Sequence, residues 1–417
     1  MRPAGADGVG DFFVILEDDD AIPGCAPALS SPHPAPDTPP RRVKILIAPD
    51  KFKGCMSALG AAEAIARGLR AALPQAEIAL APIADGGEGF AETLAAVLGA
   101  EWVRQVVHDP LGREVEARWA WLERERLAIL DMSEASGLWR VTPAERDPLR
   151  ASTYGTGQLL RAAVARGARK ILVGLGGSAT TDGGVGMAAA LGYQFLDAQG
   201  GALPPQPSAL PALARIDASA VPRLPAIFAA CDVQNPLLGP RGAARVFGPQ
   251  KGADPATVAT LESGLERLAA VVARTLDCEH REVPGAGAAG GIAFGLLSFC
   301  GAEIGSGFDL VAEVLQLEKR IAASDLVITA EGRLDGQTLE GKGPAGVAAL
   351  ARQQGKPTLA LAGSVAADAA LDTIFAATCP IIDEPVTLDE AMRRGPEFLE
   401  RAARRAGRLL ALGRTLG

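Results

Sequence analysis

The stretch VGLGGSATTDGGVGMAAALG, residues 173–192, combines a glycine-rich backbone with short hydroxyl side chains and a single carboxylate, Asp182. Backbone amides that glycine leaves bare can solvate phosphate oxygens, and short hydroxyls can do the same. A carboxylate beside them can hold Mg²⁺ or accept the proton of an attacking hydroxyl. The stretch therefore predicts a phosphoryl-transfer site with Asp182 as base or metal ligand. The expected phosphate contacts are Gly176, Gly177, Ser178, Thr180 and Gly183.

The same stretch allows other interpretations. Residues 174–179 match the G-x-G-x-x-A fingerprint of dinucleotide-binding folds, with Asp197 about 20 residues downstream. A nicotinamide-dependent hydroxy-acid oxidoreductase is therefore an alternative, although residues 183–184 would break the helix that should face the pyrophosphate. Glycine used only for close packing would explain Gly174, but not the hydroxyls together with Asp182. A non-catalytic hydroxy-acid-binding regulator is a further alternative, for which the chain shows no basic helix-turn-helix.

Four other loops carry acids at places where chemistry is expected. The loops APDKFKG, ADGGEG, CDVQNP and TAEGRLDG each follow an apolar run typical of a buried strand. In a doubly wound sheet, ligands bind where loops leave the carboxyl ends of the strands. We therefore expect these loops to line one cleft with the glycine-rich stretch. Their acids are Asp50, Asp85, Glu88, Asp232, Glu331 and Asp335.

The order of the elements predicts an α/β fold of two domains. The apolar runs 43–48 and 77–83 enclose a helical pattern and form a βαβ unit, and the α/β pattern returns near the C-terminus. Residues 101–133 instead alternate with a period of two, which is typical of antiparallel hairpins. The sequence thus predicts a doubly wound parallel sheet interrupted by an inserted mixed α/β domain. We place the first domain at 43–100 and 301–417 and the inserted domain at 101–300.

Composition excludes several classes of function. The chain has 417 residues and a formal net charge of −8, which argues against a nucleic-acid surface. No apolar run approaches the roughly 20 residues that span a bilayer, so we expect no membrane partner. Six cysteines without a CxxC pair indicate reduced thiols and a cytoplasmic location, and three histidines disfavour a zinc site. Residues 1–42, biased toward proline, aspartate and serine, are expected to form a disordered N-terminal extension.

Several long blocks resemble the signature blocks of the glycerate kinase type 1 family and follow them in order across residues 43–415. They are ILIAPDKFKGCMSA, PIADGGEGF, YGTGQL, GLGGSATTDGGVGMAAALG, CDVQNPL, VFGPQKGA, GAGAAGGIAFG and TAEGRLDGQTLEGKGPAGVA. The resemblance implies one flavodoxin-like and one inserted α/β domain with the active site between them. It also implies ATP-dependent phosphorylation of D-glycerate with Mg²⁺, with 2-phosphoglycerate favoured over 3-phosphoglycerate. The expected partners are D-glycerate and, for a homodimer, a second copy of the chain.

The resemblance also assigns roles to the residues that match these blocks. Arg333 and Lys53 are expected to hold the substrate carboxylate, because arginine offers a bidentate fork. Lys251 and Lys342 are expected at the phosphates, and Asp182 and Asp232 at the metal. The candidate catalytic residues are Asp182, Asp85 and Lys53. The candidate substrate-binding residues are Asp50, Lys53, Ser57, Arg333, Glu331 and Asp335. This chain departs from many members of the family at Lys51, Gly54 and Cys55.

Overall fold

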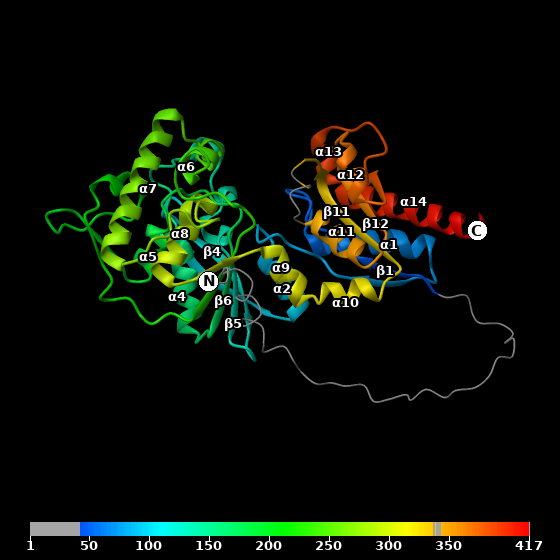
Figure 1. Ribbon diagram of the computed structural model, residues 1–417, viewed down its shortest axis with the longest axis horizontal. Coiled ribbons are helices and arrows are strands. Elements are labelled where there is room, and N and C mark those ends of the chain that lie inside the picture. The colour runs from blue at the N-terminus through cyan, green and yellow to red at the C-terminus, as the bar shows by residue number, and fades with distance from the viewer. Residues whose placement is uncertain (1–41, 337, 339–342, 417) are drawn as a thin grey trace, which may run out of the picture.

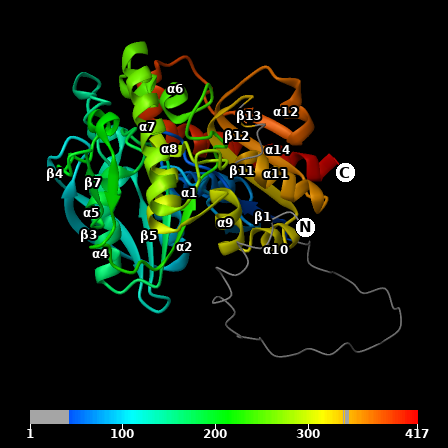
Figure 2. The same ribbon diagram turned by 60° about the vertical axis from the view of Figure 1, so that its left-hand side comes forward.

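The computed structural model describes residues 42–336, 338 and 343–416. Within this part of the chain, two main β-sheets form two lobes, with helices packed on their faces (Figures 1 and 2). The predicted N-terminal extension, apart from Arg42, and the predicted phosphate ligand Lys342 lie outside the described residues. Among the described helices, none combines the length and the apolarity that a bilayer crossing requires.

The five-stranded sheet confirms the predicted doubly wound domain. All its strands are parallel, in the order β13-β12-β11-β1-β2. Counted along this domain alone, that is the order 2-1-3-4-5 of flavodoxin-like folds. The strands are β1 (Lys44–Ile47), β2 (Glu77–Leu80), β11 (Leu326–Leu334), β12 (Thr358–Val365) and β13 (Ala377–Pro380).

Helices cover both faces of this sheet. The helix α1 (Ala58–Ala72) begins after Ser57, whose side chain accepts a hydrogen bond from the amide of Gly60 at 3.2 Å. Such a cap satisfies an amide that the first turn leaves without a helical partner. α1 and α14 (Gly395–Leu416) pack on one face, and α10 (Leu317–Ala322) and α11 (Pro344–Gln353) on the other. The short helices α12 (Ala369–Ile374) and α13 (Leu388–Arg393) complete the domain.

The six-stranded sheet is mixed, as predicted for the inserted domain. Its order is β10-β9-β6-β5-β4-β3, in which β3, β4 and β5 form an antiparallel meander and the remaining pairs are parallel. The period-two segment is this meander, and it buries Trp119 and Trp121. The strands are β3 (Glu101–His108), β4 (Glu114–Leu122), β5 (Leu127–Asp131), β6 (Lys170–Gly174), β9 (Ala226–Ala230) and β10 (Glu303–Gly305).

The helices of this lobe pack mainly on one face of the six-stranded sheet. They are α4 (Tyr154–Ala165), α5 (Val185–Ala190), α6 (Ala243–Phe247), α7 (Pro255–Leu276) and α8 (Ala288–Cys300). A small hairpin of β7 (Gln194–Leu196) and β8 (Arg215–Asp217) adjoins them. The short helix α3 (Ser133–Ser136) and the 3₁₀ turn η2 (Leu138–Arg140) follow β5.

A single apolar core joins the two sheets. The helices α2 (Phe90–Leu98) and α9 (Gly307–Val314) lie between the lobes (Figure 1). Their buried faces meet Leu46 of the five-stranded sheet and Leu172 of the six-stranded sheet in one cluster. The segments that flank the predicted boundaries at residues 100 and 301 contact the six-stranded sheet, because α2 packs on it and β10 pairs with β9.

Candidate active site

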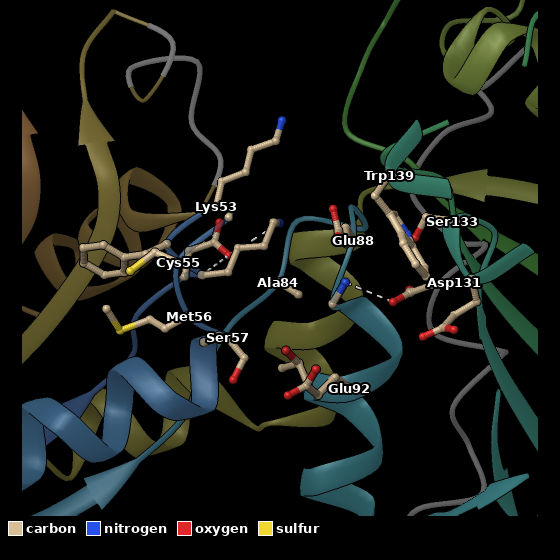
Figure 3. A pocket seen from close by; sticks show the side chains of 18 of the residues that line it. Lys53, Cys55, Met56, Ser57, Ala84, Glu88, Glu92, Asp131, Ser133 and Trp139 are labelled. Carbon is tan, nitrogen blue, oxygen red and sulfur yellow. Dashed lines mark hydrogen bonds and ion pairs between the residues drawn. The ribbon is translucent and has the colours of Figure 1, made fainter. Parts of the chain in front are cut away.

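A pocket opens where the carboxyl ends of strands from both sheets meet. One wall is the segment 50–58 that follows β1, and the other comes from α2, β5 and the turns after β5. Figure 3 shows Lys53, Cys55 and Ser57 on one side and Asp131 and Trp139 on the other. The loops APDKFKG and ADGGEG contribute residues to this pocket, whereas the described residues of the glycine-rich stretch, CDVQNP and TAEGRLDG are not part of its lining.

Four carboxylates and one ammonium form an acid cluster that reaches the pocket through Asp50 and Lys51; its members are Asp50, Asp85, Asp232, Glu331 and Lys51. The Lys51 Nζ lies 3.0 Å from Asp85 Oδ1 and 3.9 Å from Asp50 Oδ1. Asp232, which follows β9, adds to the negative field at Asp50. The structure thus brings together acids from four loops that are far apart in the sequence, and Lys51 balances only part of their charge.

Burial makes two of these acids unusually weak. Burial raises the pKa of Asp50 to about 6, although Lys51 opposes the shift. Burial raises the pKa of Glu331 to about 7, although its Oε1 accepts a hydrogen bond from Thr338 Oγ1 at 2.7 Å. Burial also acts to raise the pKa of Asp85, but the ion pair with Lys51 outweighs it and the pKa is lowered. Carboxylates with pKa values near neutrality are suited to proton transfer.

The ADGGEG loop connects the acid cluster to the glycine loop that follows β6 of the six-stranded sheet. Asp85 Oδ1 accepts the amide of Gly87 at 2.9 Å, which fixes its carboxylate beside Lys51. A Cβ placed on Gly176 would lie only 2.3 Å from the Cα of Gly87, so the two loops touch through bare backbone. Glycine is required at this crossing because any side chain would separate the loops.

Asp182 lies behind the pocket rather than in it. Its side chain is completely buried, and burial raises its pKa. Its carboxylate accepts four hydrogen bonds, at 2.8 Å from both the amide and the hydroxyl of Thr153, 3.0 Å from Gly184 N and 3.1 Å from Gly186 N. These donors occupy its lone pairs, so the arrangement favours a role in holding the glycine loop over the predicted role of base or metal ligand.

Lys251 is also placed differently from its predicted contact with phosphate. Its side chain is buried, and its Nζ donates to Ser178 Oγ at 2.8 Å and to the carbonyl of Thr180 at 2.5 Å. Burial lowers its pKa to about 7, although Asp182 opposes the shift. In this arrangement Lys251, Ser178 and Thr180 hold one another on the inner side of the glycine loop.

Comparison with known proteins shows which family the chain belongs to. The sequence matches the Glycerate kinase family over residues 45–411. The chain belongs to the glycerate kinase family. A Bacillus subtilis glycerate kinase is 41% identical over 383 residues, covering 90% of this chain and 99% of that protein. An Escherichia coli glycerate 2-kinase is 43% identical over 384 residues, covering 89% and 99%.

The fold agrees with the same family. A crystal structure from Salmonella typhimurium LT2, assigned to glycerate kinase 2, superposes with a TM-score of 0.79 at 41% identity. The match covers 90% of this chain and all of the other. As a member of the glycerate kinase family, the protein is a kinase with a two-domain α/β fold.

The expected substrate ligands of this kinase fall into two groups. Lys53 and Ser57 line the pocket with Asp50, and Lys53 is exposed. Arg333 is not among the described residues that line it: its side chain is 70% exposed and its Nε lies 2.9 Å from Asp335 Oδ2. The two regions are nevertheless adjacent, since a Cβ on Gly332 would lie 3.8 Å from the Lys53 amide.

Two residues of the site were not among the predicted candidates. Lys51 is the cation of the acid cluster, and the sequence showed it only as a departure from many members of the family. Thr153 supplies two of the four hydrogen bonds of Asp182. Lys51 could have been found from its position beside Asp50, but the pairing of Thr153 with Asp182 depends on tertiary packing.

The acid cluster has the right chemistry for a hard divalent cation. Its carboxylate oxygens outnumber its single ammonium, and such oxygens are the ligands that Mg²⁺ prefers. Among the described residues, however, no group of three or more acids, histidines or cysteines is arranged around a common metal position.

Proposed function

We propose that the protein transfers the γ-phosphoryl group of ATP to D-glycerate in the pocket between the two sheets. One observation carries this proposal: the acid cluster joins weak carboxylates and a lysine at the shared carboxyl ends of the strands. Phosphoryl transfer needs a site that positions an acceptor hydroxyl and balances charge, with only modest basicity. Membership of the glycerate kinase family selects this chemistry among the transfers that such a site would support.

The acceptor is proposed to bind on the side of the pocket formed by residues 50–57. D-glycerate offers a carboxylate and two hydroxyls, and Lys53 is an exposed cation on this wall. Arg333 could join Lys53 by leaving Asp335, because the two segments are adjacent. Ser57 offers a hydroxyl at the start of α1, where its oxygen is also the helix cap.

Asp50 is proposed as the proton acceptor. It lines the pocket, its pKa of about 6 leaves it mostly ionised at neutral pH, and it lies beside the segment that holds the acceptor. Lys51 keeps Asp85 charged and orients both carboxylates. Burial, and to a smaller extent the neighbouring carboxylates of Asp50, Asp335 and Asp85, raise the pKa of Glu331 to about 7, and Glu331 is a second candidate for the proton.

The donor is proposed to be ATP with Mg²⁺. Asp85 and Asp232 are the residues proposed to hold the cation, which would neutralise charge on the phosphates when bound. The backbone of Gly176, Gly177 and Gly87 is the proposed phosphate cradle, since these bare segments meet beside the acid cluster. Thr180 and Lys251 would support this cradle from behind, and Gly183 would shape it.

The proposed product is 2-phosphoglycerate. The similar Escherichia coli protein is named for the 2-position. In D-glycerate the 2-hydroxyl is directly next to the carboxylate, so a cation that holds the carboxylate also fixes this hydroxyl. We also propose a cytoplasmic location, where ATP is available and the five free cysteines among the described residues would stay reduced.

The decisive experiment mixes the protein with ATP, Mg²⁺ and D-glycerate and follows release of ADP and formation of the phosphorylated acid. We expect ADP and 2-phosphoglycerate in equal amounts, with the position of the phosphate assigned by ³¹P NMR. Formation of 3-phosphoglycerate would overturn the regiochemistry alone. Binding of glycerate without turnover would support the regulator, and reduction of NAD by a hydroxy acid would support the oxidoreductase.

A further inference from the structure

Two tryptophans of the inserted domain are left exposed at the pocket. Trp139 is 56% exposed and Trp102 is 38% exposed, and both line the pocket. Trp119 and Trp121, on β4 of the same domain, are each 1% exposed. The fold therefore buries indole rings where it can, and an indole left open in a pocket of a small-molecule enzyme points to a ligand with a flat apolar face.

Trp139 is held in place on one face. The guanidinium of Arg140 lies 4.2 Å from the ring centroid. Arg140 is itself fixed, because its Nε donates to the carbonyl of Glu134 at 2.9 Å and its guanidinium donates to the carbonyl of Glu116 at 2.8 Å. A cation on one face of an indole leaves the other face for stacking. Figure 3 shows Trp139 standing beside Ser133 along the pocket wall.

The same segment is hydrogen-bonded to the glycine loop. The amide of Leu138 donates to the carbonyl of Gly177 at 2.7 Å, and the amide of Ala179 donates to the carbonyl of Ser136 at 2.9 Å. Trp139 is therefore one residue from a direct backbone contact with the proposed phosphate cradle. A ligand that places phosphates on Gly177 would reach Trp139 with the group attached to them.

We propose that Trp139 is the stacking platform for the adenine ring of ATP, with Arg140 as its positioning residue. D-glycerate is small and polar and has no flat apolar face, so it gives no reason for an open indole. A purine has such a face, and the phosphates that follow it match the adjoining glycine loop. This inference rests on the proposed kinase function and assigns the nucleoside end of its donor.

The test compares Trp139→Ala with Trp139→Phe and with the control Leu409→Ala. The control removes another exposed apolar side chain, but from α14, outside the pocket. We expect Trp139→Ala to raise KM for ATP about ten- to hundredfold, as for loss of base stacking on an aromatic side chain. KM for D-glycerate and kcat should stay within about twofold, Trp139→Phe should keep most of the affinity, and Leu409→Ala should resemble the wild type.

A ligand that has the phosphates of ATP but no nucleobase distinguishes loss of stacking from a disturbed phosphate site. Tripolyphosphate, used as an inhibitor competitive with ATP, should bind the wild type and Trp139→Ala equally well. The assignment would be overturned if Trp139→Ala bound ATP and tripolyphosphate with equally reduced affinity. It would also be overturned if the substitution raised KM for D-glycerate and left KM for ATP unchanged. Failure of the wild type to use or bind ATP would instead overturn the proposed function together with it, and the wild-type measurement distinguishes the two cases.

Discussion

Asp182 and Asp50 are both buried carboxylates with raised pKa values, yet their surroundings differ. Asp182 accepts four hydrogen bonds, all from Thr153 and its own loop. Asp50 accepts the amide of Lys51 at 2.7 Å and otherwise faces an ammonium and other acids. A carboxylate whose lone pairs are all occupied supports the fold, whereas a crowded one beside a pocket can exchange protons or bind a cation.

The largest effect is expected for Asp50→Asn. Loss of a positioned base should lower kcat about 10²- to 10⁴-fold, measured as ADP release with saturating substrates. The melting temperature should hardly change, because burial already disfavours the charged form of Asp50. Asp254→Asn, at the exposed cap of α7, is the control and should keep full activity. If Asp50→Asn kept a normal kcat, the role of proton acceptor would have to be assigned to Glu331 or Asp85 instead.

For Asp182→Asn we expect a large loss of stability and only a small loss of kcat. The side-chain NH₂ of the new asparagine would face the hydrogen-bond donors of Thr153, Gly184 and Gly186. The free energy of unfolding should therefore fall by about 2–4 kcal/mol. Chemical denaturation measures this loss, and kcat of the folded fraction should fall less than about tenfold. If instead kcat fell a hundredfold at unchanged stability, Asp182 would be the base after all.

A smaller effect should appear in the pH dependence of stability. The pKa of Lys251 is about 7 in the folded protein, below its value in the unfolded chain, so between these values only the unfolded state carries the proton. As the pH rises from 7 toward 10, this group should therefore increase the free energy of unfolding by at most about 1.4 kcal/mol per pH unit. Lys251→Met should remove that gain in denaturation series at several pH values. An identical slope in both proteins would contradict the burial of an ionisable amine.

The smallest effect is expected for removal of residues 1–42. The first strand begins at Lys44, and the match to the family begins at residue 45. Deletion should therefore leave kcat, both KM values and the melting temperature unchanged. A drop of several degrees in the melting temperature would show that the segment stabilises the body of the protein.

The sequence was informative wherever a pattern was local. The apolar runs predicted the parallel sheet, and the alternation around Trp119 and Trp121 predicted the meander. The acids of three loops that follow strands, Asp50, Asp85 and Asp232, lie near one another, although the shared cleft remains a prediction. It was least informative about burial. Whether Asp182 and Lys251 face a ligand or each other depends on how helices pack behind the glycine loop, and no local pattern reports that. The domain boundaries also depend on packing, because β10 joins a strand formed more than seventy residues earlier in the chain.

The order of the strands delays completion of the five-stranded sheet during synthesis. The amide of Lys44 binds the carboxylate of Asp325, 281 residues later in the chain, and β1 lies between β2 and β11. At roughly 5–20 residues per second, a ribosome would need about 15 to 60 seconds to supply that partner. During this interval the apolar residues of β1 and the buried face of α1 would lack their cover, while β3, β4, β5, β6 and β9 of the other sheet, which end at residue 230, could already pair. The first βαβ unit must therefore wait, with apolar surface uncovered, until the C-terminal strands of its own sheet have been made.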